Sequence, residues 1–228
     1  MLLPLSPLSA EEKIFVIGLP RTGTTSVCAA LLDMGFKVAH TAFTREAVEQ
    51  AQVIADTPAF SEFPQLHGLF PKARFIYLQR DLRLWLPSIK TLLEKMSLAK
   101  EGGKGIINPL LERCFEQVFG SFGVACLQDD QYLAACYQRH FELVDNYFST
   151  QTNALLTLDV SEAVSLRKLA DFVSVELAGD LEFPRLNING KITAWKDIKH
   201  PMKIDSNAAG EYRRRYYSYD VIEKKPTK

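Results

Sequence analysis

Short apolar runs alternate along the chain with longer segments in which apolar residues recur every three or four positions. The short runs are rich in β-branched and aromatic residues and predict strands, whereas the longer segments predict amphipathic helices. The predicted strands are Lys13–Ile17, Phe36–His40, Gln52–Ala55, Arg74–Gln79 and Ala154–Leu158. The predicted helices are Thr24–Met34 with Gly35 as its cap, a segment that begins at Thr44, a segment that follows a loop at residues 56–58 and ends at Leu69, Leu82–Ala99, Pro109–Phe119, Asp129–Phe148 and Ala163–Val173. This alternation predicts an α/β fold with three layers, in which helices cover both faces of a parallel sheet.

Polar residues directly follow three of the predicted strands. Gly18, Asp56 and Arg80 each come after such a strand. In sheets of this kind, ligands bind beyond the carboxyl ends of the strands. We therefore expect three positions that are far apart in the sequence to meet at one edge of the sheet.

The segment Gly18-Leu-Pro-Arg-Thr-Gly-Thr-Thr25 joins the first predicted strand to the first predicted helix. A glycine-rich turn before a helix directs backbone N–H groups and the positive end of the helix dipole at an anion. The Gly-x4-Gly-x-Thr spacing is typical of a phosphate-binding loop. Thr24, however, stands where nucleoside-triphosphate hydrolases and kinases have lysine, so the loop is poorly suited to γ-phosphoryl transfer. Arg21 is the only cation inside it.

A second candidate for phosphate binding is formed by Arg80 and Ser88. Arg80 ends the strand Arg74–Gln79, and Ser88 follows eight residues later in the next predicted helix. A forked guanidinium together with a neutral hydroxyl donor suits a dianionic phosphate. In the alternative interpretation, Arg80 pairs with Asp81 or a helix acid, and Ser88 is an ordinary solvated residue.

A third and weaker candidate lies near the C-terminus, in Asn189-Gly-Lys-Ile-Thr-Ala-Trp-Lys196. This turn contains a glycine and the cation Lys191. It is equally well read as a surface turn that Trp195 anchors.

Together these three segments resemble the sulfotransferase family. Its members bind the 5′-phosphosulfate of 3′-phosphoadenosine 5′-phosphosulfate (PAPS) with Pro-(Lys/Arg)-(Ser/Thr)-Gly-Thr-Thr, which residues 20–25 match at every position. An arginine and a serine in the arrangement of Arg80 and Ser88 hold the 3′-phosphate in the family. The C-terminal turn departs from the family pattern, because the usual Arg-Lys-Gly order and a second glycine are missing. The resemblance covers roughly residues 13–196 and implies a P-loop nucleotide-hydrolase-like fold. The cofactor-binding residues that it implies are Pro20, Arg21, Thr22, Gly23, Thr24, Thr25, Arg80, Ser88 and Lys191.

The resemblance also implies which residues carry the chemistry. Sulfuryl transfer requires a base near the acceptor and a cation near the oxygen of the leaving phosphate. The family places a histidine or glutamate at the end of the strand before the 3′-phosphate arginine, where this chain has Asp56. Burial would have to raise the pKa of that carboxyl. Asp56 is equally well placed to cap the following helix. Arg21 replaces the lysine of many members and is expected to stabilise the leaving phosphate electrostatically.

The four histidines are secondary candidates. His40 ends a predicted strand and is an alternative base. We expect His67 to lie at the surface or to cap a helix, and His140 and His200 have no partner at a useful spacing. No histidine or cysteine stands at metal-ligand spacing, and the implied reaction needs no metal.

Composition limits the remaining possibilities. The chain has 228 residues, of which 47% are hydrophobic, and is expected to form one domain over 1–228, with an extension at 1–12 and a tail at 204–228. Its formal net charge of zero gives no general attraction to nucleic acids or anionic membranes. The basic, tyrosine-rich stretch 212–219 is interpreted as a solvated helix face or a packed tail.

The cysteines and the hydropathy pattern suggest where the protein resides. Cys28, Cys114, Cys126 and Cys136 form no C-x-x-C pair, so we expect free thiols and a reducing, cytoplasmic environment. The sequence has neither a signal peptide pattern nor an apolar run of about eighteen residues, so no membrane span is predicted.

The predicted function is that of a PAPS-dependent sulfotransferase, which releases 3′,5′-adenosine bisphosphate and sulfates a hydroxyl or amine of a small-molecule or glycan acceptor. The sequence leaves the acceptor and the oligomeric state open, although Gly102–Gly105 and Phe119–Gly123 fall where an acceptor lid could form. A catalytically inactive nucleotide-binding or regulatory protein of the same fold is the main alternative. A small-molecule kinase is disfavoured by the missing loop lysine.

Overall fold

In the computed structural model, the described residues are 12–101, 108–120, 129–150, 154–177, 183, 187–188, 191–192 and 194–207; for 99–101, 187–188 and 191–192 only the backbone is described. The strands are β1 (Ile14–Val16), β2 (Val38–Ala39), β3 (Val53–Ala55), β4 (Arg74–Gln79), β5 (Leu155–Asp159), β6 (Asn187–Ile188) and β7 (Lys191–Ile192). The helices are α1 (Thr24–Asp33), α2 (Arg45–Gln50), α3 (Ala59–Leu69), α4 (Leu82–Glu101), α5 (Pro109–Phe119), α7 (Asp130–Phe148), α8 (Ser165–Phe172) and the 3-10 turn η2 (Trp195–Asp197).

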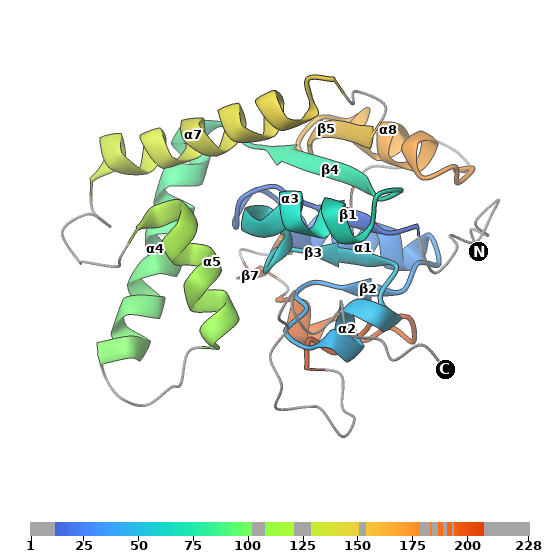
Figure 1. Cartoon of the computed structure of the whole chain (residues 1–228), viewed down its shortest axis with the longest axis horizontal. Helices are drawn as coiled ribbons and strands as arrows, with labels where there is room; N and C mark the ends of the chain where they lie inside the picture. Colours follow the sequence, from blue (N-terminus) through green and yellow to red (C-terminus); the bar gives the residue numbers. More distant parts are fainter. Residues whose placement is uncertain are drawn as a thin grey trace.

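Five strands form one parallel sheet in the order β2-β3-β1-β4-β5. Strand β1 lies in the middle, with its residues Ile14, Phe15 and Val16 completely buried. Because every neighbouring pair of strands is parallel, the connections cross over through helices, which cover the sheet. The α/β fold with a parallel sheet between helices, expected from the sequence, is confirmed (Figure 1).

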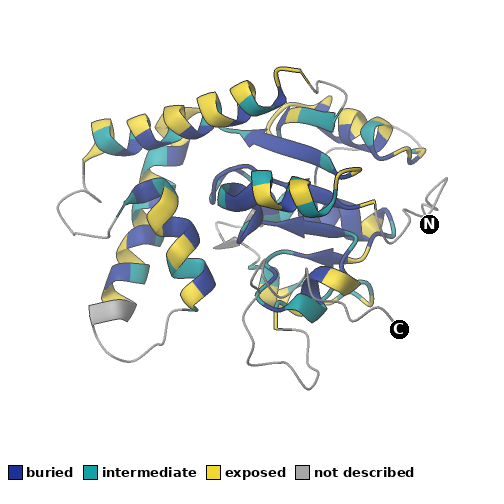
Figure 2. Cartoon of the chain, viewed as in Figure 1, coloured by how far each residue is buried: buried dark blue, intermediate teal, exposed yellow. Residues whose placement is uncertain are grey.

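Side chains that alternate along the strands divide the core into two clusters. Phe15 of β1 and Phe75 and Tyr77 of β4 point into the cluster formed with α2, α3, α4, α5 and α7. Ile14, Val16 and their counterparts on β4 point into the cluster formed with α1 and α8. Figure 2 shows the buried strands between helices that are exposed on their outer sides. The period of two along each strand thus produces the three layers.

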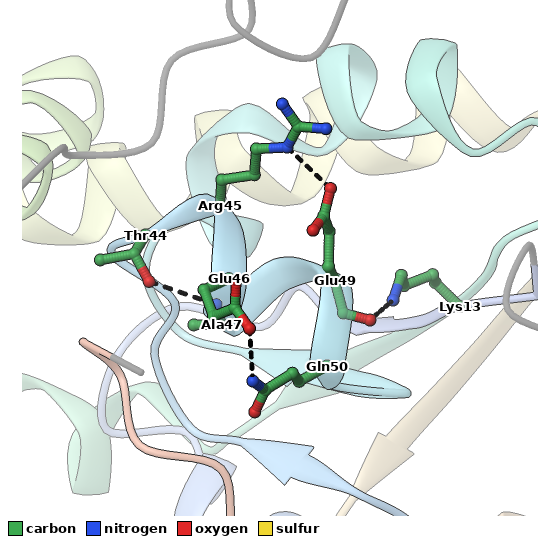
Figure 3. A network of polar contacts seen from close by, with 7 residues as sticks. All are labelled: Lys13, Thr44, Arg45, Glu46, Ala47, Glu49 and Gln50. Carbon is green, nitrogen blue, oxygen red and sulfur yellow. Dashed lines mark hydrogen bonds and ion pairs between the residues drawn. The ribbon is translucent and has the colours of Figure 1, made fainter. Parts of the chain in front are cut away.

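The helix ends follow local capping rules. Thr44 Oγ1 accepts the Ala47 N–H at 3.2 Å and begins α2, on which Arg45 Nε donates to Glu49 Oε1 at 2.7 Å (Figure 3). Asn108 and Asp129 cap α5 and α7 in the same way. Helix α1 ends at Asp33 with Met34 as its cap, one residue before the Gly35 cap expected from the sequence.

The segment after η2 returns to the sheet beside β2. The Val38 N–H donates to the Met202 carbonyl at 3.0 Å, and the Ile204 N–H donates to the Val38 carbonyl at 2.9 Å. Thr41 Oγ1 and Ser206 Oγ lie 2.6 Å apart. Residues 202–206 are therefore hydrogen-bonded to β2, at one edge of the sheet, and to the segment that joins β2 to α2.

Two further expectations concern the cysteines and membrane spans. Cys28, Cys114 and Cys136 are buried free thiols, as expected, while Cys126 lies outside the described residues. Among the described helices, none is both long and apolar enough to cross a bilayer.

Candidate functional site

The loop between β1 and α1 is closely packed at its two glycines. A Cβ on Gly18 would lie 2.5 Å from Leu78 Cβ and 2.9 Å from the Leu78 nitrogen, on the adjacent strand β4. Gly23 has φ +110°, and a Cβ there would lie 2.6 Å from Val160 Cγ2, just beyond β5. Both positions require glycine for space, and Gly23 also for its backbone conformation.

Gly23 is the N-cap of α1 and has no side chain to accept the first N–H groups of the helix. The Ser26 N–H donates to the Gly23 carbonyl at 3.0 Å, which leaves the N–H groups of Thr24 and Thr25 for an acceptor outside the helix. The helix dipole adds positive potential at the same place. Thr25 beside them is partly exposed, whereas Thr24 is 4% exposed. The start of α1 is therefore suited to bind an anion.

Inside the loop, other groups brace it. Thr22 is completely buried, and its Oγ1 donates to the Leu19 carbonyl at 2.7 Å. The Pro20 carbonyl accepts the Trp85 Nε1–H at 2.9 Å. The side chain of Thr22 and the carbonyl of Pro20 thus hold the loop in shape, and neither group points out of it.

Arg21 and Ser88, predicted from separate segments, lie in contact. Arg21 Nε donates to Ser88 Oγ at 2.8 Å. Arg21 also has a positive φ of 74°, a conformation that is unusual for arginine and costs free energy. Strained residues of this kind concentrate at functional sites. Ser88 of α4 therefore receives a specific bond from the loop.

Arg80 lies at the end of β4 against the same loop. Its Nη1 donates to the Arg21 carbonyl at 2.6 Å. The Tyr137 hydroxyl accepts the Arg80 N–H at 2.9 Å and donates to the Arg80 carbonyl at 3.1 Å. Asp81 pairs with Arg83 and not with Arg80, so the alternative in which Asp81 neutralises Arg80 is wrong.

Two aromatic residues that were not predicted as site residues hold Arg80 and the loop in place. Trp85 of α4 binds the loop through Pro20, and its ring meets that of Tyr137 edge-on at 4.9 Å. Trp85 lies within the Arg80–Ser88 segment and could have been noticed there. Tyr137 lies on α7, and nothing in its local sequence indicates a contact with Arg80.

The two arginines make the site positive. Burial, then the nearby charge of Arg80, lowers the pKa of Arg21, while Asp56 raises it. Within the described part of the chain, neither arginine forms an ion pair with a carboxylate. Two neighbouring cations that are both partly exposed favour the binding of an anion with two or more charges.

Asp56 follows β3 at the same edge of the sheet, with φ +48°. Asp56 is partly exposed. Burial nevertheless raises the pKa of its carboxyl to about 6, although hydrogen bonds from Thr57 and the charge of Arg21 act to lower that pKa. Thr57 Oγ1 donates to Asp56 Oδ1 at 3.4 Å. Helix α3 has Pro58 as its N-cap and no side-chain cap. The alternative in which the Asp56 side chain caps α3 is therefore wrong, while its role as a base stays a prediction.

The remaining predicted positions are placed less fully. Lys191 lies in β7, but its side chain is outside the described residues, as are Gly102–Gly105 and residues 121–123. Phe119 is 1% exposed and packs on Trp85 and Phe115. It belongs to the core and lines no open acceptor pocket.

The structure places His40, His67 and His140 in different surroundings. His40 Nε2 lies 3.1 Å from Thr25 Oγ1, so this residue belongs to the loop. His67 was expected at the surface or at a helix cap, but it is half-buried among Phe75, Tyr147 and Phe148. His140 Nε2–H donates to the Phe60 carbonyl at 2.7 Å, and the residue is 4% exposed. No group of His, Cys, Asp and Glu among the described residues could hold a metal.

Comparison with known families identifies a match over most of the chain. The model of a family described as a sulfotransferase domain matches residues 13–50 and 41–192. The matched range includes the loop, Asp56, Arg80, Ser88 and Lys191. A comparison with curated protein sequences found no match.

Proposed function

Because this chain belongs to the sulfotransferase domain family, we propose that it takes a sulfuryl group from PAPS and transfers it to a hydroxyl or amine of a small-molecule or glycan acceptor. Membership of the family supports sulfotransfer in general. The donor, the type of acceptor and the roles of individual residues are the proposal.

The pair Arg21 and Arg80 beside the uncapped start of α1 carries this proposal. Arg80 Nη1 donates to the Arg21 carbonyl at 2.6 Å, which holds both residues at one edge of the sheet. A nucleotide with phosphate groups at its 3′ and 5′ ends has two separate anions to bind. The first N–H groups of α1 suit the 5′ end, and Arg80 with Ser88 suits the 3′ end.

Asp56 is proposed as the base. With a pKa of about 6, the Asp56 carboxyl is mostly ionised at pH 7. The resulting carboxylate is a stronger base than that of an ordinary aspartate. Asp56 takes the proton of the acceptor group while the new bond to sulfur forms. PAPS supplies the activated sulfur–oxygen bond that breaks, and Arg21 stabilises the negative charge left on the phosphate oxygen.

Calorimetric titration tests the nucleotide part of the proposal. We expect 3′,5′-adenosine bisphosphate to bind without added metal, and ADP and NAD to bind at least about tenfold more weakly because they lack the 3′-phosphate. Equal or absent binding of all three nucleotides would contradict the use of PAPS. Transfer of a labelled sulfuryl group from PAPS to a panel of phenols, sugars and amines then tests turnover. Selective binding without any transfer would favour a binding or regulatory protein.

A further inference from the structure

His40 lies against both threonines that begin α1. Its Nε2 is 3.1 Å from Thr25 Oγ1 and 3.3 Å from Thr24 Oγ1. His40 comes directly after β2, whereas the threonines form the first turn of α1. One ring nitrogen is therefore within hydrogen-bond distance of both hydroxyls at the anion-binding end of the helix.

The segment after β7 also contacts the His40 imidazole. The Trp195 ring packs on His40 with 5.3 Å between centroids and 34° between planes. Lys203 Nζ lies 4.8 Å from the centre of the Trp195 ring and donates to the carbonyls of Trp195 and Ile198 at 2.5 and 2.9 Å. Since Lys203 also bridges to Val38 of β2, this segment and His40 are held to the same strand.

The protonation of His40 decides what the threonines can do. Burial, together with the charge of Lys203, lowers the pKa of His40 to about 4. The ring is therefore neutral near pH 7 and carries a single N–H. A threonine hydroxyl has one hydrogen, so a hydroxyl that donates to Nε2 has none left for a bound anion. If Nε2–H instead donates to the hydroxyl oxygen, the hydroxyl hydrogen stays free for that anion.

We propose that His40 is a positioning residue whose Nε2–H donates to the hydroxyl oxygen of Thr25, so that the Thr25 hydrogen points to the 5′-phosphate end of the bound nucleotide. Thr25 is the partner because it is the closer and the more exposed of the two threonines. This inference rests on the proposed function and adds to it a residue that acts through Thr25 and not by contact with the acceptor.

Two substitutions at one position separate the N–H from the bulk of the ring. His40→Leu keeps an apolar side chain against Trp195 but has no donor, and His40→Gln supplies an amide N–H at a similar reach. We expect His40→Leu to bind 3′,5′-adenosine bisphosphate more weakly, by up to about tenfold, because the Thr25 hydroxyl is no longer held in the orientation that bonds the anion. Its affinity for adenosine 3′-monophosphate, which has no 5′-phosphate, should be unchanged. His40→Gln should restore most of the loss.

A double-mutant cycle tests whether the effect passes through Thr25. Thr25→Val should show the same selective loss, and adding His40→Leu to it should weaken binding no further. Nitrogen-15 chemical shifts of the wild-type imidazole report its tautomer, and the Nε2–H form is expected. This measurement does not depend on any variant folding.

The outcomes distinguish this inference from the proposed function. An Nδ1–H tautomer, an equal loss for both nucleotides in His40→Leu, an additive double variant or a His40→Leu protein that binds like wild type would each overturn the role of His40 alone. Wild-type protein that binds neither nucleotide would overturn the proposed function and, with it, this inference.

Discussion

The two ends of β1, together with the adjacent end of β4, hold cations in opposite ways. At the amino end, Lys13 is 4% exposed, and its Nζ donates to the Ala51 carbonyl at 2.6 Å and to the Glu49 carbonyl at 3.3 Å, the latter drawn in Figure 3. At the carboxyl end, Arg21 and Arg80 are partly exposed and close enough for the charge of Arg80 to lower the pKa of Arg21. Lys13 thus meets the carbonyl end of a helix, and the arginines meet the amino end of another.

This difference separates a structural cation from cations that bind a ligand. The carbonyls at the end of α2 are the natural partners of an ammonium group, so Lys13 is satisfied inside the fold. The arginines repel one another and adjoin the positive end of the α1 dipole, an arrangement that costs free energy until an anion is bound. Changes at the amino end should therefore alter folding, and changes at the carboxyl end should alter binding and turnover.

The largest effect is expected from Asp56→Asn, which removes the proposed base at the carboxyl end. We expect kcat for sulfuryl transfer to fall about 10²- to 10⁴-fold, the usual contribution of a general base. Asparagine tolerates the positive φ of this position, so the fold should persist. Asp81→Asn, at an exposed carboxylate of the same edge, is the matched control. If Asp56→Asn retains full turnover, Asp56 is not the base.

A second large effect is expected from Arg80→Ala. It should weaken the binding of 3′,5′-adenosine bisphosphate about 100-fold, because charge-assisted bonds to the 3′-phosphate are lost. Arg83→Ala removes the same charge from a side chain that is 90% exposed and should change the affinity less than twofold. Calorimetry compares the two variants. Equal losses in both would mean that only the overall charge matters.

The pH dependence of Asp56 gives a smaller effect, in stability. Its pKa of about 6 in the fold lies above the ordinary value of 3.8, so between these pH values the folded state binds more protons than the unfolded state. The free energy of unfolding of wild type should therefore fall relative to Asp56→Asn as the pH rises from 4 to 6, by about 1–2 kcal/mol. Urea titrations at several pH values measure this difference. A constant difference would show that the carboxyl is not perturbed.

At pH 7 the smallest effect is expected at the other end of β1, from Lys13→Met. Leaving the carbonyls of Ala51 and Glu49 without this donor should reduce the free energy of unfolding by about 1 kcal/mol at pH 7 and leave nucleotide affinity unchanged. Burial lowers the pKa of Lys13 to about 8 from 10.5. Wild type should therefore gain stability relative to Lys13→Met as the pH rises from 8 to 10.5. A change in nucleotide affinity would contradict the division between the two ends.

The secondary structure was largely predictable because it depends on local patterns. The bounds of β4 and α5 agree with the prediction residue for residue, since each has a clear period and a clear boundary. The convergence of Gly18, Asp56 and Arg80 at one edge also follows from the parallel sheet. What the patterns could not give is the direction of each side chain, as His67 and Phe119 show.

The sequence by itself determined the loop and its glycines, the order of strands and helices, and the residues that lie at the carboxyl edge, because these depend on neighbours in the chain and on the rules of parallel sheets. Only the tertiary structure decided that Arg21 meets Ser88, that Tyr137 holds Arg80 and that His40 holds Thr25. Each of these contacts joins residues that are far apart in the sequence, and its geometry is set by the packing of whole helices and strands. The periodic pattern of apolar residues along the chain does not predict such packing.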